Sequence, residues 1–233
     1  MSSSENDSNN SCFLERLLIS QGDFRQLLPP PEEYLDKLIR IRRLFDNKPV
    51  TGYFGDYPYV RLPLTDFDPP MNPQDIETMA ELLVTQLLVE HRECFNQANL
   101  IVSEADRGGG PLTQAVAQRL NLPYVLANWY PNETPGQLIV SAKVGFSGNG
   151  QLCLNGIKGG EKVIVVDDLL SRGGTLIGLT EALSKGGAEV LMALMVGEKV
   201  DQNGRNNVGQ KYSFPIETLV PFVVDRQKTR VIR

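Results

Sequence analysis

From residue 99 onward, short apolar runs alternate with loops and helical patterns, and this alternation limits the fold more than any other feature. The runs cover residues 99–103, 123–129, 162–168, 189–196 and 217–224. Each run is short and nearly continuous, as in strands that are buried on both faces. Strands that alternate with helices favour a parallel sheet covered by helices. We therefore expect an α/β fold with a Rossmann-like parallel sheet flanked by helices.

The chain before residue 98 follows a different pattern. Residues 1–10 are rich in Ser and Asn and are predicted to be a disordered tail. We expect residues 11–97 to form a helical extension, with one helix after a triple proline and a longer one that begins at Pro73. The aromatic and Pro/Gly-rich residues 52–73 between these helices favour irregular or β structure.

The remaining segments complete the predicted organisation. Residues 98–224 are expected to form the core domain. Within it, the Gly-rich sequence SGNG lies between two apolar segments and predicts a β-hairpin. Residues 225–233 carry four basic side chains and one acid, and we expect them to be a solvated basic tail.

Composition excludes several classes of function. The net charge is −5, which does not favour a nucleic-acid groove or an anionic membrane surface as a partner. No apolar run approaches the roughly 20 residues that span a bilayer. The N-terminal sequence lacks a basic stretch followed by an apolar one, so we expect no secretory signal and a cytoplasmic location. A protein of this charge that binds phosphate must use local amides, a few cations or a metal ion.

Residues 161–176, EKVIVVDDLLSRGGTL, contain the main candidate site. Asp167 and Asp168 follow a buried strand, and ligands of such sheets bind beyond the carboxyl ends of the strands. Gly173 and Gly174 can adopt positive φ before a helix, whose first amide groups point at an anion. The pattern predicts a phosphate site beside two acids that can bind sugar hydroxyls or Mg²⁺. The alternative is an ordinary strand-to-helix turn with incidental acids.

Two other phosphate-binding patterns are absent from the sequence. No G-x-x-x-x-G-K-[ST] stretch occurs, which excludes a P-loop. The sequence GFSGNG neither has the G-x-G-x-x-G order nor opens a helix, so it does not predict a dinucleotide site.

The stretch VIVVDDLLSRGGT resembles the phosphoribosyl-pyrophosphate (PRPP) motif of type I phosphoribosyltransferases. The resemblance extends over residues 98–224 and is greatest to the adenine and archaeal-type hypoxanthine enzymes. It implies the type I phosphoribosyltransferase fold with an N-terminal hood. Residues 52–70 either contribute to this hood or pack in the core against the long helix, and no base contact is assigned to them. It also implies transfer of ribose 5-phosphate from PRPP to a purine, with release of pyrophosphate, by a homodimer that uses Mg²⁺ in nucleobase salvage.

The resemblance assigns roles to particular residues. Asp167 and Asp168 would be the catalytic acids, contacting the ribose hydroxyls and, directly or through water, Mg²⁺. Arg107 and Gly108 fall in the place of the pyrophosphate-binding loop, and residues 130–150 in that of a mobile loop. The residues that would surround the 5′-phosphate are Ser171, Arg172, Gly173, Gly174 and Thr175.

Two departures from the family pattern leave the function open. Asn128 and Trp129 replace an Arg-Lys pair, so two cations that pair with pyrophosphate are missing. Trp129 can stack on a base or pack against the sheet. Arg172 replaces a small hydroxyl residue, and we expect its side chain to turn outward rather than to contact phosphate.

The departures keep three functions under consideration. The first is an active purine phosphoribosyltransferase, and the second is a non-catalytic PRPP- or nucleotide-binding regulatory protein on the same fold. The third is a transferase for another base or a phosphorylated sugar. Loss of the Arg-Lys pair favours the regulatory protein, but no helix-turn-helix pattern or basic stripe supports its DNA-binding form.

Overall fold

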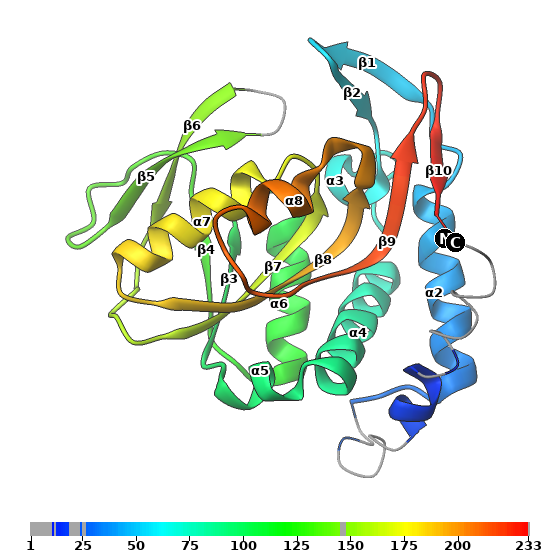
Figure 1. Ribbon diagram of the computed structural model, residues 1–233, viewed down its shortest axis with the longest axis horizontal. Helices are drawn as coiled ribbons and strands as arrows, with labels where there is room; N and C mark the ends of the chain where they lie inside the picture. Colours follow the sequence, from blue (N-terminus) through cyan, green and yellow to red (C-terminus); the bar gives the residue numbers. More distant parts are fainter. Residues whose placement is uncertain (1–10, 12, 19–23, 25–26, 145–147, 233) are drawn as a thin grey trace.

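The computed structural model describes residues 11, 13–18, 24, 27–144 and 148–232, without the side chains of residues 143–149. Its centre is a six-stranded sheet (Figure 1). In spatial order the strands are β10 (Thr229–Val231), β9 (Ile216–Val224), β8 (Glu189–Lys199), β7 (Lys162–Leu170), β3 (Leu100–Glu104) and β4 (Tyr124–Ala127). All neighbouring strands are parallel except β10, which is antiparallel to β9. The predicted parallel α/β sheet is confirmed.

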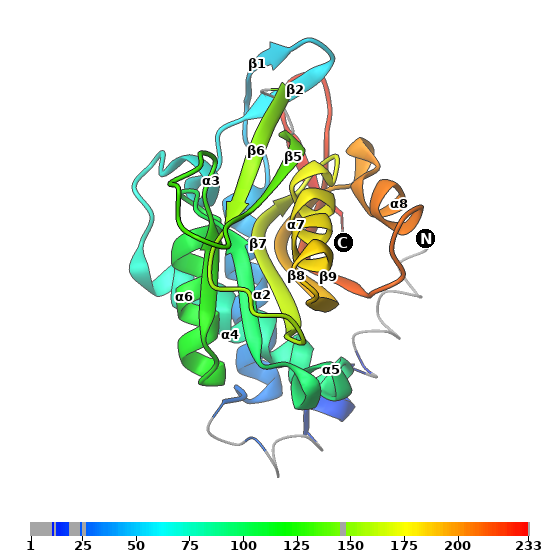
Figure 2. The same ribbon diagram turned by 90° about the vertical axis from the view of Figure 1, so that its left-hand side faces the viewer.

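Helices cover both faces of this sheet (Figure 2). The longer helices are α2 (Pro31–Phe45), α4 (Pro73–Glu90), α6 (Gly109–Leu120) and α7 (Gly174–Lys185), and the short ones are α3 (Pro63–Asp66), α5 (Arg92–Gln97), η1 (Val200–Gln202) and α8 (Gly204–Gly209). Helices α2, α4 and α6 share a hydrophobic cluster on one face, whereas α7 and α8 share a second cluster on the other. Among the described residues, no helix has the length and hydrophobicity needed to cross a bilayer.

Strand β7 shows why an unbroken apolar run suits this architecture. Ile164 and Val166 belong to the cluster beneath α2, α4 and α6, whereas Val163 and Val165 belong to the cluster beneath α7. All four side chains are fully buried. Successive side chains of a strand point to opposite faces, so a central strand covered on both sides has no position left for a polar residue.

The expected helices before residue 98 are present. Helix α2 begins at the last residue of the triple proline. Helix α4 begins at Pro73 with Asn72 as its N-cap, whose side chain accepts a hydrogen bond from the Gln74 amide at 3.0 Å. Both helices contribute to the same cluster as the sheet. The division of the chain at residue 97 stays a prediction.

The C-terminal segment differs from the expected solvated tail. Residues 229–231 form β10 and extend the sheet beyond β9. The buried Thr229 hydroxyl donates to the Phe45 carbonyl at 2.5 Å and accepts from the Lys48 amide at 2.8 Å. The side chains of Arg226, Lys228 and Arg230 stay exposed. The described basic side chains are therefore solvated, as their charge predicts. The backbone of the segment pairs with β9, and the Thr229 hydroxyl binds it to the end of α2.

Two hairpins lie at the end of the sheet where the parallel strands terminate (Figure 1). The first pairs β1 (Val50–Phe54) with β2 (Tyr57–Val60) and overlaps the segment expected to be irregular or β. The second pairs β5 (Leu138–Val144) with β6 (Gly148–Leu154), which confirms the predicted hairpin, although residues 145–147 of its turn lie outside the described residues. Backbone hydrogen bonds between Asn128 and Cys153 join β6 to the end of β4.

Candidate functional site

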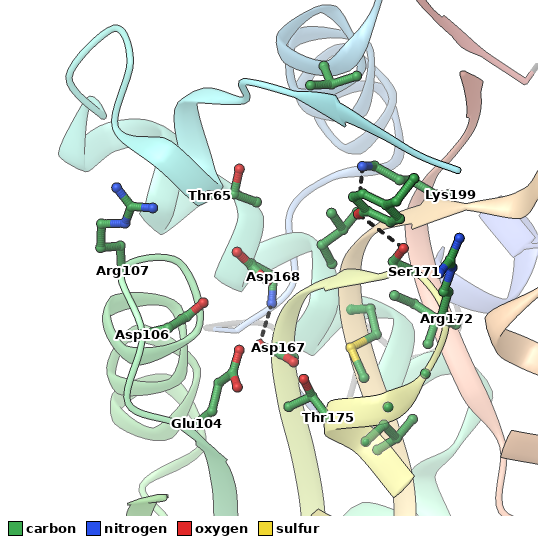
Figure 3. A pocket seen from close by; sticks show the side chains of 18 of the residues that line it. Thr65, Glu104, Asp106, Arg107, Asp167, Asp168, Ser171, Arg172, Thr175 and Lys199 are labelled. Atoms are coloured by element: carbon green, nitrogen blue, oxygen red, sulfur yellow. Dashed lines mark hydrogen bonds between the residues drawn. The ribbon is translucent and has the colours of Figure 1, made fainter. Parts of the chain in front are cut away.

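A pocket of about 270 Å³ opens at the carboxyl ends of β3, β7 and β8 (Figure 3). It is the place at which parallel α/β sheets bind ligands. Its walls come from the first hairpin and α3, the loop between β3 and α6, and the loop between β7 and α7. They include Tyr57, Tyr59, Thr65, Asp66, Glu104, Asp106, Arg107, Trp129, Asp167, Asp168, Ser171, Arg172, Gly173, Gly174, Thr175 and Lys199.

Four carboxyl groups meet in this pocket, and we call Glu104, Asp106, Asp167 and Asp168 the acidic cluster. Asp167 and Asp168 are 4% and 6% exposed. One carboxylate oxygen from each of Glu104, Asp106 and Asp167 lies within 4.8 Å of the others. The Asp168 amide donates to Asp167 Oδ1 at 3.0 Å. The predicted acid pair is therefore part of a larger group of acids from two neighbouring strands.

Glu104 and Asp106 were missed from the sequence, although a signal for them existed. Glu104 is the last residue of β3, which runs parallel to β7 and pairs with it directly. Carboxyl ends of neighbouring parallel strands meet at the same edge of a sheet. The family resemblance assigned roles in this loop to Arg107 and Gly108 alone, so neither acid was a candidate.

Burial makes the acidic cluster costly to ionise. Desolvation is the main cause that raises the pKa of Glu104 to about 9, and the charges of Asp106 and Asp168 add to it. Desolvation, with the charges of the other acids, also raises the pKa values of Asp167 and Asp168 well above the ordinary range. The pKa of Asp106 is raised by burial, against hydrogen bonds from the Gly109 and Gly108 amides. The protein alone thus favours protonated acids, and a bound cation would reverse this preference.

This electrostatic arrangement predicts how stability depends on pH in the metal-free protein. Carboxyl groups of the unfolded chain titrate near pH 4, whereas those of the cluster retain protons to a higher pH, up to about 9 for Glu104. Between these values the folded state binds more protons, so the free energy of unfolding falls as pH rises. We expect the melting temperature to fall from pH 5 to pH 9, and to fall less for Glu104→Gln. A wild-type melting temperature that rises across this interval would contradict the arrangement.

Two glycines let the loop between β3 and α6 lie directly against the acids. A Cβ atom on Gly108 would be 2.1 Å from Asp168 Oδ2. A Cβ atom on Gly109 would be 2.7 Å from Asp167 Oδ1 and 3.0 Å from Asp106 Oδ1. Any side chain larger than hydrogen would displace a carboxylate at either position.

The predicted phosphate cradle consists of residues 171–175. Gly173 has φ of +80°, which an L side chain adopts only under strain, and it is the N-cap of α7. Helix α8 supports the loop from behind, because Asn207 Nδ2 donates to the Arg172 carbonyl at 3.1 Å and a Cβ on Gly173 would meet Val208. The first amide groups of α7 have no partners within the helix and form a site suited to an anion.

Tyr57 of the first hairpin links the cradle to the buried end of β8. Its hydroxyl accepts hydrogen bonds from Lys199 Nζ at 2.7 Å and from Ser171 Oγ at 3.1 Å. Lys199 is only 2% exposed, and its ammonium group also donates to the Pro58 carbonyl at 3.3 Å. Neither Tyr57 nor Lys199 was a candidate from sequence, because a tyrosine in an irregular segment and a lysine after a strand are ordinary surface features.

The Arg172 side chain is directed at the first hairpin and not at the acidic cluster. Its Nη2 atom donates to Asp56 Oδ1 in the turn of the first hairpin at 2.7 Å, and its Nε donates to Gln202 Oε1 at 3.2 Å. The guanidinium lies 5.4 Å from the centre of the Tyr57 ring. The hydrogen bond from Arg172 and its charge lower the pKa of Asp56. In Figure 3 the Arg172 side chain lies away from the acidic cluster.

Two further predicted residues, Arg107 and Trp129, also line the pocket. Arg107 lines the pocket, with its side chain 64% exposed and Nη2 3.7 Å from Asp66 Oδ1. Trp129 lines the pocket and also packs against the hydrophobic cluster beneath α7. This position is compatible both with stacking on a base and with packing against the sheet. Asn128 uses its backbone to pair with β6.

Comparison with known proteins gives a consistent result. Residues 75–217 match the model of the phosphoribosyl transferase domain family. The hypoxanthine/guanine phosphoribosyltransferase of Methanotorris igneus is 33% identical over 178 residues, covering 76% of this chain and 92% of the relative. The enzyme of the same name from Methanocaldococcus vulcanius is 35% identical over 172 residues, covering 73% and 88%.

Solved structures agree on the fold. The adenine phosphoribosyltransferase of Thermoanaerobacter pseudethanolicus has a TM-score of 0.63 and 22% identity, covering 79% of this chain and 99% of that one. The Saccharomyces cerevisiae adenine phosphoribosyltransferase, solved with adenine and an imino-altritol bisphosphate, also has a TM-score of 0.63, with 19% identity and coverage of 79% and 99%. At these identities the likeness concerns the fold alone.

Proposed function

This chain belongs to the phosphoribosyltransferase family, and on that premise we propose that it transfers ribose 5-phosphate from PRPP to a purine in nucleobase salvage. The bond between C1 of the ribose and pyrophosphate breaks, and its electron pair leaves with pyrophosphate. A purine nitrogen forms the new bond to C1 and loses its proton. The observation that carries this proposal is one pocket that contains both the acid pair and the glycine-shaped start of α7.

Each end of PRPP has suitable partners in the proposed complex. The 5′-phosphate accepts hydrogen bonds from the backbone amides of residues 173–175 and from the Thr175 hydroxyl, and the Ser171 hydroxyl joins them by exchanging its bond to Tyr57 for one to the phosphate. Asp167 and Asp168 accept hydrogen bonds from the ribose hydroxyls and place negative charge near C1, which becomes positive as pyrophosphate leaves. Arg107, through its guanidinium, and Gly108 contact the pyrophosphate in the proposed complex.

A divalent cation fits the acidic cluster. Glu104 Oε2 is buried and has no hydrogen-bond partner, which leaves a carboxylate oxygen available for a cation. Carboxylate oxygens are the ligands that Mg²⁺ prefers, and we propose Mg²⁺ as the metal, held by Asp167 and Asp168 directly or through water. When bound, it would supply positive charge to the leaving pyrophosphate.

The outward direction of Arg172 leads to a prediction about PRPP affinity. Arg172→Thr is expected to leave the Kd for PRPP within about threefold of the wild-type value, because the guanidinium is paired with Asp56 rather than directed at the cradle. Asp56→Asn removes the same ion pair and is the matched control. Calorimetric titration with PRPP measures both. A tenfold loss in Arg172→Thr but not in Asp56→Asn would show that the guanidinium contacts the phosphate.

The base is proposed only as a purine. The curated relatives are named for hypoxanthine and guanine, whereas the solved structures are adenine enzymes. Incubation of the protein with PRPP, Mg²⁺ and each of the three bases, with measurement of pyrophosphate release, tests the proposal. Release with at least one base supports it.

The alternative function is a non-catalytic protein that binds PRPP or a nucleotide and acts in regulation. It is kept because Asn128 and Trp129 replace the Arg-Lys pair of the purine enzymes that this chain resembles. A sensor would bind PRPP in calorimetry and release no pyrophosphate with any base. We also propose a cytoplasmic location and, from the family resemblance alone, a homodimer. Sedimentation analysis at micromolar concentration tests the dimer.

A further inference from the structure

Helix α8 supports the phosphate cradle from behind, although it is part of neither the sheet nor the pocket. It follows β8 after one short 3₁₀ turn, η1, and lies beside the start of α7 (Figure 1). Among the residues that line the pocket of the acidic cluster, none comes from α8. An effect of α8 on a bound phosphate therefore has to pass through the cradle itself.

Helix α8 packs directly against the backbone of the cradle. A Cβ atom on Gly204 would be 2.1 Å from the Ser171 carbonyl oxygen, so a larger residue would displace the cradle or the helix. A Cβ atom on Gly173 would be 2.9 Å from Val208 Cγ2. Gly204 and Val208 are buried and, four positions apart, lie on one face of α8. The position of α8 therefore limits where the cradle backbone can lie.

One side chain on this face of α8 also holds the cradle by a hydrogen bond. Asn207 Nδ2 donates to the Arg172 carbonyl at 3.1 Å. That carbonyl belongs to the same peptide group as the Gly173 amide, one of the amides proposed to bind the 5′-phosphate. Because a trans peptide group is planar, its N–H points opposite to its C=O. A carbonyl held toward α8 thus directs the Gly173 N–H away from α8.

On its exposed side, α8 is attached to the sheet by Arg205. The Nε and Nη2 atoms of Arg205 donate to the two carboxylate oxygens of Glu198, at 3.2 Å and 2.6 Å, and Nη1 donates to the Ile216 carbonyl at 2.5 Å. Glu198 is 7% exposed and also accepts from the Thr218 hydroxyl at 3.0 Å. A two-pronged ion pair of this kind fixes direction as well as distance. Arg205 thus joins α8 to the ends of β8 and β9.

We propose that Asn207 is a positioning residue for the phosphate-binding amide of Gly173, and that Arg205 holds α8 where Asn207 can act. The role rests on the proposed function, because it requires the cradle to bind the 5′-phosphate of PRPP. Neither side chain touches the phosphate or C1 of the ribose. Loss of either should weaken phosphate binding equally in the ground state and the transition state, which raises the KM for PRPP and leaves kcat unchanged.

The test compares Asn207→Ala with Asn206→Ala, two equal truncations in one helix. Asn206 is exposed and donates only to Asn203 Oδ1, at 2.6 Å, so it is the matched control. Asn207→Ala should raise the KM for PRPP and the calorimetric Kd for ribose 5-phosphate about fivefold, the effect of one hydrogen bond, at unchanged kcat. Asn206→Ala should keep both constants within about twofold of the wild-type values.

Arg205→Gln tests the attachment of α8. It should raise the same two constants at least about tenfold, because the buried Glu198 loses its partner and the whole helix is released. Adding Asn207→Ala to Arg205→Gln should then cause no further loss, since Asn207 acts only from an attached helix. Losses that multiply in the double variant would overturn the role given to Arg205.

Hydrogen exchange of the full chain without PRPP gives a readout that needs no turnover. The Ile177 amide donates to the Gly173 carbonyl at 3.0 Å, in the first turn of α7, and the Gly186 amide donates to the Ala182 carbonyl at 3.0 Å at the other end. Asn207→Ala should speed exchange at Ile177 about fivefold and leave Gly186 unchanged. Asn206→Ala should change neither amide.

The outcomes separate this inference from the proposed function. Unchanged exchange at Ile177 in Asn207→Ala, equal effects of Asn207→Ala and Asn206→Ala, or a fall in kcat at unchanged KM overturns the inference even if the protein makes a nucleotide. Faster exchange at Ile177 and weaker ribose 5-phosphate binding in Asn207→Ala alone sustain it, even if no base supports turnover and the proposed function fails.

Discussion

Replacement of Asp167 and Asp168 together by asparagine is expected to lower turnover at least about a thousandfold, or about 4 kcal/mol of transition-state stabilisation. The two carboxylates are proposed to contact the ribose hydroxyls beside C1, where positive charge develops. Asparagine keeps the shape of each side chain but not its charge. The measurement is initial-rate pyrophosphate release at saturating PRPP and base.

The fold should survive this double substitution. Both carboxyl groups are almost fully buried, and burial raises their pKa values well above the ordinary range, so an uncharged amide relieves electrostatic cost. The melting temperature at pH 8 should therefore equal or exceed that of the wild type. Asp75→Asn is the control, because Asp75 is an aspartate of α4 with only 9% exposure and lies outside the pocket. Wild-type turnover in the double variant would exclude the acid pair as the catalytic centre.

Gly108→Ala is expected to lower turnover at least about a hundredfold, or about 2.7 kcal/mol, because the new methyl group would be 2.1 Å from Asp168 Oδ2. The carboxylate has to move away from the position proposed for ribose binding. Gly108 has φ of −88° and ψ of −51°, which alanine adopts freely, so backbone strain does not contribute. The effect should therefore report the displacement of Asp168.

Gly110→Ala is the matched control in the same loop and helix. A Cβ on Gly110 would meet only Leu126 Cδ1, at 3.7 Å, which is an ordinary contact. Alanine also favours the helix more than glycine does. Gly110→Ala should keep wild-type turnover within about twofold and a melting temperature at least as high. Equal losses in the two variants would indicate a general disturbance of α6 rather than a specific clash.

The sequence allowed the sheet and the acid pair to be predicted because both depend on local patterns. A continuous apolar run such as residues 163–166 can be buried only between two layers, and the strand end that carries Asp167 and Asp168 is set by chain direction. The positive φ of Gly173 was predictable for the same reason, since a glycine pair before a helix needs little tertiary information.

The rest of the site depends on contacts between distant segments. Tyr57 and Lys199 meet across 142 positions of sequence, and no local pattern marks either residue. Glu104 joins Asp167 only because β3 and β7 are neighbours in the sheet. β10 was missed because its attachment uses backbone groups and the Thr229 hydroxyl, which leave no apolar signal in the sequence.

The central claim is that this pocket transfers ribose 5-phosphate to a purine, and detection of the nucleotide product tests it most directly. The wild-type protein would be incubated with PRPP, Mg²⁺ and hypoxanthine, guanine or adenine in separate reactions, and the products identified by mass spectrometry. We predict a purine nucleoside 5′-monophosphate, formed in equal amount to pyrophosphate and absent with the Asp167→Asn/Asp168→Asn variant. Measurable PRPP binding with no nucleotide from any of the three bases would contradict the claim and identify a PRPP-binding regulatory protein instead.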